Sequence, residues 1–155
     1  MNTRARMDEV AHLIREALKH LEAARAEKGK PSPDYHRLLG QSLAAMRSAW
    51  RALLTYHDVP HEASAPLVRL GEQADELASI LRLWVDLAPG LEAHFLALAS
   101  KETLSVADRE QALQGYYVAR DAVHTTLGEL PPALVAAATG ADGQATPAEA
   151  TAAVA

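Results

Sequence analysis

A run of apolar residues at helical spacing, over residues 35–54, is the feature that most constrains the fold of this chain. The run recurs at steps of three and four, at Leu39, Leu43, Met46, Trp50, Leu53 and Leu54. This is the period of one buried face of an α-helix. Ser32 and Pro33 suit the N-cap and the first turn of that helix. Pro60 marks its end, because the residue before a proline is disfavoured in the α region. The stretch predicts a long helix, a corner and the start of a second helix.

Helical periodicity also marks the sequence on both sides of this stretch. Further helices are predicted at about 3–28, 65–87, 91–99 and 105–129. Pro89 and Gly90 separate the third predicted helix from a short fourth one. Ser105, with Asp108 three residues later, is close to a capping box at the start of the last helix. No segment alternates as a strand does, so we predict an all-α, up-and-down bundle of four main helices plus one short helix.

The length and the local composition divide the chain into a bundle and a tail. A chain of 155 residues is long enough for one domain with a single core. We assign residues 1–130 to the helical bundle. Residues 131–155 are a low-complexity tail of alanine, threonine, glycine and proline, which we expect to be disordered from Thr139 onward.

The charge and the absence of cysteine exclude several function classes. A net charge of −5 argues against a general binder of nucleic acids or anionic membranes. A chain without cysteine forms no disulfide, no thiolate metal site and no cysteine nucleophile. No apolar run approaches the ~20 residues of a membrane span. We therefore expect a cytoplasmic protein with no cofactor, no resident metal and no membrane contact.

Two arginines stand on the predicted inward line of the last helix. This line comprises Arg109, Leu113, Tyr116, Arg120, Val123 and Leu127. A buried guanidinium needs partners, so these positions are the least expected of a plain structural helix. We take Tyr117, Arg109 and Asp121 as candidate binding residues.

The end of the third predicted helix is apolar on nearly every side. Such a segment is either buried between several elements or exposed as a self-association surface. We expect Leu83, Trp84 and Val85 to form this interface.

Three segments resemble, in order, parts of one known helical family: a long second helix, the corner into the third helix, and the start of the last helix. The segments are Tyr35–Leu43 with Ala49–Leu54, Val59-Pro60 with Leu67 and Leu70, and Leu104–Asp108 with Ala112. The family is the HEPN domain, a helical bundle named for nucleotide binding in higher eukaryotes and prokaryotes. The resemblance covers residues 3–130 and implies a five-helix bundle that forms homodimers.

The resemblance implies one of two functions. Some members are metal-independent ribonucleases of toxin–antitoxin systems, and others are non-catalytic partners or substrate-binding modules of small nucleotidyltransferases. The ribonucleases carry an arginine, a polar residue directly after it, and a histidine that follows the arginine after four to six residues. The nearest match here, Arg120-Asp121 with His124, has three intervening residues and lacks the standard spacing. This departure favours a non-catalytic binding or accessory module with a nucleotidyltransferase-type partner or a nucleotide ligand, rather than an enzyme.

Two alternatives stay open. In the first, the protein is a ribonuclease, because a spacing of four places Arg120 and His124 on one helix face. His124 would act as general acid or base and Arg120 would stabilise phosphoryl charge. The same two residues beside Tyr117 are also compatible with a plain packing pair.

In the second alternative, the protein is a DinB-like metal-binding bundle. Such a site needs three histidines from different helices. The candidates are His36 and His57 together with either His94 or His124.

Overall fold

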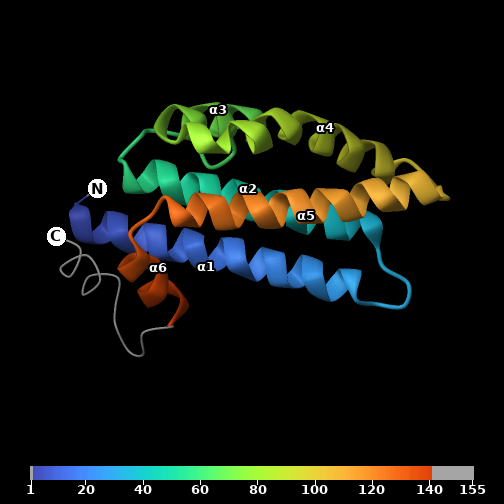
Figure 1. The fold of residues 1–155 in the computed structure, drawn as a ribbon, viewed down its shortest axis with the longest axis horizontal. Helices are drawn as coiled ribbons and strands as arrows, with labels where there is room; N and C mark the ends of the chain where they lie inside the picture. The colour runs from blue at the N-terminus through green and yellow to red at the C-terminus, as the bar shows by residue number, and fades with distance from the viewer. Residues whose placement is uncertain (1, 141–155) are drawn as a thin grey trace.

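The computed structural model describes residues 2–140, and these form an all-α bundle (Figure 1). The elements are α1 (Thr3–Lys28), α2 (Tyr35–Tyr56), α3 (Leu67–Leu77), the 3₁₀ turn η1 (Ser79–Leu81), α4 (Arg82–Ala99), α5 (Val106–Gly128) and α6 (Pro132–Thr139). α1, α2, the α3–α4 arm and α5 alternate in direction along the long axis. The predicted all-α, up-and-down bundle is therefore confirmed. None of the helices described combines the length and the apolar character that a membrane-spanning segment requires.

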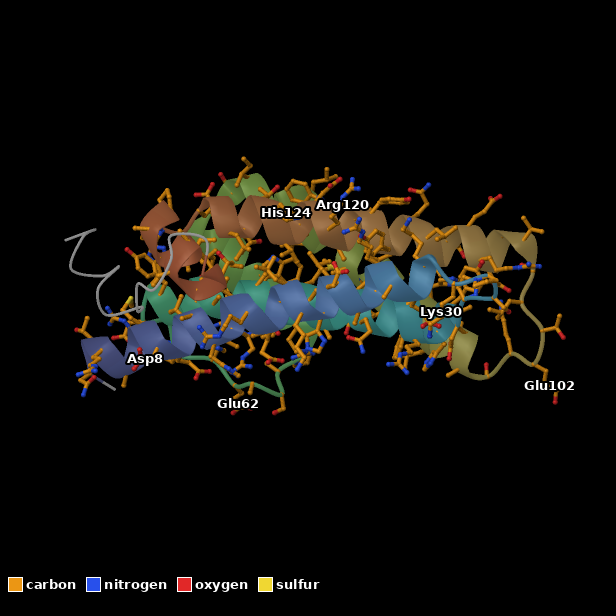
Figure 2. The ribbon with its side chains drawn as sticks, turned by 90° about the horizontal axis from the view of Figure 1, so that it is seen from below. Asp8, Lys30, Glu62, Glu102, Arg120 and His124 are labelled. Atoms are coloured by element: carbon orange, nitrogen blue, oxygen red, sulfur yellow. The ribbon has the colours of Figure 1, made fainter. Side chains whose placement is uncertain are left out.

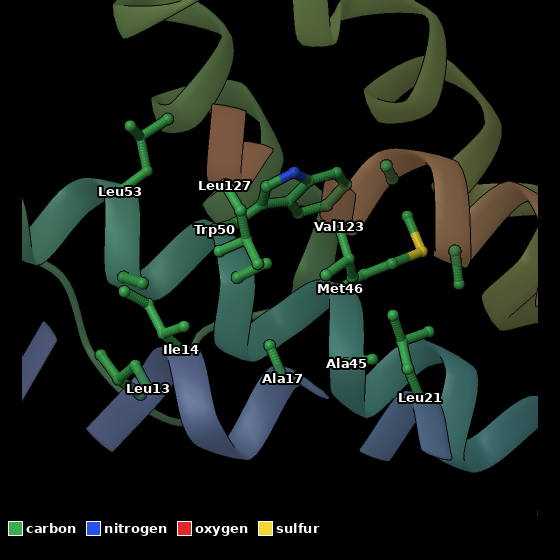
Figure 3. Close-up of a cluster of buried hydrophobic side chains, with 14 of the residues drawn as sticks. Leu13, Ile14, Ala17, Leu21, Ala45, Met46, Trp50, Leu53, Val123 and Leu127 are labelled. Atoms are coloured by element: carbon green, nitrogen blue, oxygen red, sulfur yellow. The ribbon is translucent and has the colours of Figure 1, made fainter. Parts of the chain in front are cut away.

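α2 is the central helix, as the strength of its apolar periodicity predicts. It packs on α1 along most of its length and on α5, α3 and α4. Trp50 of α2 is fully buried, as are Met46 beside it and Ile14 of α1. Figure 3 shows these side chains between α1 and α5, with Val123 and Leu127 of α5 closing the cluster. This shared core fixes α5 next to α1.

α2 and α5 approach closely because small residues line the contact. Gly115 of α5 lies over Leu39 of α2, so a Cβ at this glycine would stand 2.5 Å from Leu39 Cδ1. Ala112, Ala119 and Ala122 are fully buried on the same face. Small side chains allow two helix backbones to come together, and the larger side chains of α5 then lie at the edges of this contact.

Two carboxylates hold the corners between helices. At the α4–α5 corner, the predicted capping box is present: Asp108 N–H donates to Ser105 Oγ at 3.1 Å, and Ser105 N–H donates to the Asp108 carboxylate at 3.0 Å. The hydrogen bond from Lys101 Nζ, at 2.7 Å, and the one from Ser105 N–H lower the pKa of Asp108 to about 2. At the α1–α2 corner, Glu27 accepts hydrogen bonds from Lys30 and from the backbone of Asp34, which lower its pKa.

The start of α2 differs from the expectation by two residues. Asp34, not Ser32, is the N-cap, and its carboxylate accepts a hydrogen bond from Arg37 N–H at 3.0 Å. Pro33 therefore lies outside the helix. Asp and Ser are equally suitable caps, and the hydrogen bond from Asp34 N–H to the buried Glu27 selects between them.

The break in the third predicted helix lies at Ala78 and not at Pro89-Gly90. Ala78 is extended, with φ −146° and ψ 93°, whereas α4 continues through Pro89. An internal proline costs a helix about 3 kcal/mol. The helix persists because its buried residues Val85, Ala88 and Leu98 lie on one side of α4, and their packing spans the proline.

The bundle extends beyond residue 130, the boundary expected from the sequence. α6 packs on α1, and Leu134, Ala137 and Ala138 are buried in this contact. Pro132 starts this helix, in agreement with the preference of proline for a first turn. The predicted disorder of the low-complexity tail concerns residues 139–155. Of these, 141–155 lie outside the described residues, and Thr139 is helical.

Candidate functional site

A groove of about 520 Å³ between α1 and α5 contains both members of the predicted Arg120 and His124 pair. The remaining lining residues are Leu18, Leu21, Glu22 and Arg25 from α1 and Tyr116 from α5. Figure 2 shows the labelled Arg120 and His124 as neighbours along α5. Their spacing of four residues brings them to one helix face, and that face is turned toward α1. The prediction that the two side chains share one face is confirmed.

The Arg120 side chain faces solvent, although the sequence pattern placed it on the inward line of α5. Its side chain is 45% exposed, and Arg109 is also exposed. The expectation was wrong for the two arginines, whereas Tyr116, Val123 and Leu127 of the same line are buried as expected. The small residues Ala112, Gly115 and Ala119 face α2, which places both arginines at the edge of this contact.

Two cations and two tyrosine rings lie close together, and Arg120 and Tyr116 among them line the groove. The Arg120 guanidinium lies 5.0 Å from the ring centroid of Tyr117, and Lys28 Nζ lies 5.8 Å from the same centroid. Lys28 also approaches the ring of Tyr116, at 5.9 Å, and the two tyrosine rings meet edge to face. Cations at these distances are attracted to a ring face, so Tyr117 holds Lys28 and Arg120 near each other despite their like charge.

Each arginine of the groove is paired with an exposed carboxylate of its own helix, and Arg120 Nε donates a hydrogen bond to Asp121 Oδ1 at 3.2 Å. Arg120 Nη2 lies 3.2 Å from Asp121 Oδ1, and Arg25 Nη1 lies 3.7 Å from Glu22 Oε2. All four side chains are substantially exposed, and such pairs contribute little stability. Both guanidinium groups therefore keep donors that an anionic ligand can use at little cost.

A second, apolar groove of about 470 Å³ continues from the first one. It runs between α5 and α6, and its lining includes Leu127, Leu130 and Val135. Leu18 and His124 line both grooves. The site therefore has a polar section that suits an anionic group and an apolar section next to it, with His124 at their junction.

The other predicted binding residues lie at unequal distances from this site. Tyr117 and Asp121 contact Arg120, which lines the groove, but they do not line it themselves. Arg109 is eleven residues from Arg120, or about 16 Å along the helix axis. Its guanidinium lies 3.5 Å from the Leu104 carbonyl oxygen at the start of α5. The structure thus places Tyr117 and Asp121 with Arg120, and Arg109 apart from them.

The histidines do not gather into one centre. His36 stacks on Phe95 with ring centroids 4.2 Å apart, and the Nε2 of His94 lies 3.1 Å from the Asp108 carbonyl oxygen. His57 caps the far end of α2, and His124 lies in the groove. Over residues 2–140, no three His, Asp or Glu side chains are arranged to hold a metal ion. The DinB-like alternative therefore has no ligand set in the part of the chain that the structure describes.

The predicted interface residues occupy three different environments. Leu83 is 62% exposed, Trp84 is partly buried, and Val85 is buried in the bundle, where its methyl groups lie over Gly71 of α3. Val85 is therefore unavailable to a partner. Only the outer side of this segment is free to contact another surface.

The α1 half of the groove was not among the expected site residues. Glu22, Arg25 and Lys28 are polar residues that follow the apolar stripe of α1 toward its end. A local signal exists, since residues at steps of three share one helix face and these three end at the helix terminus. The tertiary arrangement determines which helix lies opposite these three residues, and no local sequence pattern predicts that helix.

Comparison of the chain with family models, with curated proteins and with solved structures found no match.

Proposed function

We propose that this protein is a non-catalytic, HEPN-like binding module whose α1–α5 groove binds the phosphate group of a nucleotide. The observation that carries the proposal is that Arg120, His124 and Arg25 line one groove, with the ring of Tyr117 close to both Arg120 and Lys28.

The residue types match the chemistry of a nucleotide. A guanidinium presents several donors in a planar fork that fits the oxygens of a phosphate group. The exposed ring of Tyr117 is an aromatic surface of the kind on which a base stacks. The groove is a shallow surface feature with two carboxylates nearby, Glu22 and Asp121, which oppose the anion. We therefore expect weak binding, with a dissociation constant on the order of 0.1 to 1 mM.

The test is a titration of the full chain with AMP, ATP and GTP, followed by chemical shifts in NMR spectra. The expected result is saturable shifts at Arg25, Arg120 and His124. Arg120→Ala should weaken binding about tenfold, the usual effect of losing one charge-assisted contact. Arg109→Ala is the matched control, because it removes an exposed arginine from the same helix outside the groove. Equal weakening by both variants, or no shifts at several millimolar nucleotide, would contradict the proposal.

A metal-independent ribonuclease is the second candidate, favoured by the presence of Arg120 and His124 in one solvent-open groove. In that case His124 would transfer the proton to or from the reacting oxygen, and Arg120 would stabilise charge on the phosphoryl group. The spacing of this pair departs from the arginine–histidine motif, which is why we place binding first. RNA cleavage in the presence of EDTA that is lost in both His124→Ala and Arg120→Ala, but not in Arg109→Ala, would reverse this order.

The HEPN resemblance also suggests a protein partner of the nucleotidyltransferase type. Arg25 and Arg120 would then bind a nucleotide or a phosphorylated group presented by that partner. Binding that requires the partner, and that Arg120→Ala abolishes, would support this form of the proposal.

A further inference from the structure

The apolar groove between α5 and α6 has no charged lining residue. Nine residues line it, and none of them is aspartate, glutamate, lysine or arginine. Apart from His124 and Thr139, the lining consists of leucine, valine, proline, alanine and glycine. Thr139 donates its hydroxyl to the Ala136 carbonyl oxygen of its own helix at 3.1 Å. In the described part of the chain, His124 is therefore the one lining side chain with a donor left for a ligand.

The charged lining residues lie at the other end of the same depression, in the groove between α1 and α5. Arg25, Arg120 and Glu22 line that end, and two guanidinium groups against one carboxylate make it positive. Leu18 and His124 line both grooves, so the two are continuous. A ligand that fills both must have an anionic group at one end and an uncharged, apolar part at the other, because each end disfavours the opposite chemistry.

The lining of the apolar groove favours an aliphatic chain over other apolar groups. A peptide segment would lose water from its N–H and C=O groups and find almost no partners there. A nucleotide base has the same difficulty, because its ring nitrogens and exocyclic groups also need hydrogen bonds. An alkyl chain has no polar group to satisfy, and it can follow the irregular surface that Leu127, Leu130 and Val135 provide.

The length of the groove sets the length of the chain. The lining residues of α6 extend from Pro132 to Thr139, which is about 10 Å along the helix axis. An extended carbon chain advances about 1.2 Å per bond, as the extended polypeptide backbone does. A chain of about eight carbons therefore spans the apolar groove.

We infer that the ligand of the α1–α5 groove is a phosphate ester that carries an unbranched aliphatic chain of about eight carbons. The phosphate lies between Arg25 and Arg120, the chain lies between α5 and α6, and His124 stands where the two meet. This inference rests on the proposed function for the position of the phosphate and adds the chain to it. The ligand is a single dissolved molecule and not a bilayer lipid, because the net charge of −5 opposes approach to an anionic membrane.

The test is calorimetric titration of the full chain with ethyl, butyl, hexyl and octyl phosphate. A half-buried CH₂ group tightens binding about twofold, so octyl phosphate should bind about 60-fold more tightly than ethyl phosphate. Octyltrimethylammonium carries the same chain on a cation and should bind at least about tenfold more weakly than octyl phosphate. Equal affinities for ethyl and octyl phosphate would overturn the inference. Equal affinities for octyl phosphate and octyltrimethylammonium would overturn it too.

Two variants place a charge in the apolar groove. Gly128 lines it, and a Cβ added there would meet no atom within 4 Å, so Gly128→Glu should leave the fold intact. This variant and Val135→Asp should each bring the ratio of octyl to ethyl affinity close to one. Gly90→Glu is the matched control, because Gly90 is equally open but lies on α4. Arg120→Ala should weaken binding of every phosphate by the same factor and leave the ratio unchanged. A ratio that both groove variants leave unchanged would overturn the inference.

NMR spectra locate the chain. Octyl phosphate, but not ethyl phosphate, should shift the methyl signals of Leu127, Leu130 and Val135. Shifts confined to the exposed Leu83 of α4 would overturn the inference. Nuclear Overhauser effects between Val135 and residues 141–155 in the ligand-free chain would identify that segment as the occupant and would also overturn it.

The inference and the proposed function fail in different ways. Binding of AMP, with no gain from the octyl chain, would refute the chain and leave nucleotide binding in place. Octyl phosphate binding that Arg120→Ala weakens, without any binding of AMP, would refute the nucleotide and support the chain. Attachment of the protein to vesicles of an anionic phospholipid, without binding of octyl phosphate, would overturn the inference in favour of a membrane surface.

Discussion

Replacing Gly115 by alanine tests whether the close approach of α5 to α2 is what holds the groove helix in place. An added Cβ would stand 2.5 Å from Leu39 Cδ1 and 3.3 Å from Leu91 Cδ2. Leu39 is fully buried, so its side chain can move away only by displacing the core residues around it. Overpacking of this kind costs about 1 to 3 kcal/mol. Alanine gains about 0.5 to 1 kcal/mol over glycine within a helix. The clash outweighs the gain over most of these ranges, and the net loss should be about 1 kcal/mol and at most about 2.5 kcal/mol.

Thermal unfolding followed by circular dichroism measures this loss. At about 3 °C per kcal/mol for a domain of this size, Gly115→Ala should melt about 3 °C, and at most about 7 °C, below the wild type. Gly128→Ala is the matched control on the same helix, because nothing lies within 4 Å of its added Cβ. This variant should melt at or slightly above the wild-type temperature.

A double variant separates the clash from other effects. Leu39→Val shortens the side chain that meets the new methyl group, so it should cost less in the Gly115→Ala background than in the wild type. If Gly115→Ala melts as high as Gly128→Ala, the α2–α5 contact has room for a methyl group. The explanation given above for why the arginines of α5 face outward would then be wrong.

The remaining predictions concern the corners and α6. The pKa of Asp108 in the folded state, about 2, lies below its ordinary value of 3.8, so the contribution of this carboxylate to stability is complete above about pH 4 and is lost as the pH falls toward 2. Asp108→Asn should therefore flatten this part of the stability profile, measured by urea unfolding at several pH values. An unchanged profile would contradict the role of Lys101. Glu27→Gln keeps an acceptor for Asp34 N–H but loses the ion pair with Lys30, so it should lower the melting temperature less than Glu27→Ala, and equal losses would refute the hydrogen bond to Asp34 as the main contribution. Leu134→Ala should cost about 2 to 4 kcal/mol because this side chain of α6 is buried, whereas a loss below about 0.5 kcal/mol would show that α6 is not part of the bundle.

The local signals in the sequence predicted the elements of the bundle well. The helix at residues 3–28 and the capping box of Ser105 and Asp108 are present as expected, because both depend on residues within a few positions of each other. The break at Ala78 and the continuity through Pro89 were not predicted. Both features depend on which residues of this segment pack against α2 and α5. No glycine or proline marks the break at Ala78 in the sequence.

The site was predicted on one helix and missed on the other. A spacing of four residues was enough to place Arg120 and His124 together, because helix geometry alone determines it. Arg120 was expected to face inward and is exposed, although Val123 and Leu127 of the same predicted line are buried. Arg25 and Lys28 were not expected at the site because their position opposite α5 depends on packing between elements nearly a hundred residues apart.

The central position of α2 has a consequence for the order of folding. α1 and α2 are consecutive, and their contact is the most extensive one between any two helices described. Closing the short loop between them costs little chain entropy. The α1–α2 hairpin is therefore suited to act as the folding nucleus, with α5 docking afterwards. Substitutions in this hairpin, such as Ile14→Val, should mainly slow folding, whereas substitutions in α6 should mainly speed unfolding. The groove would then form only in the last steps of folding, when α5 packs against α1.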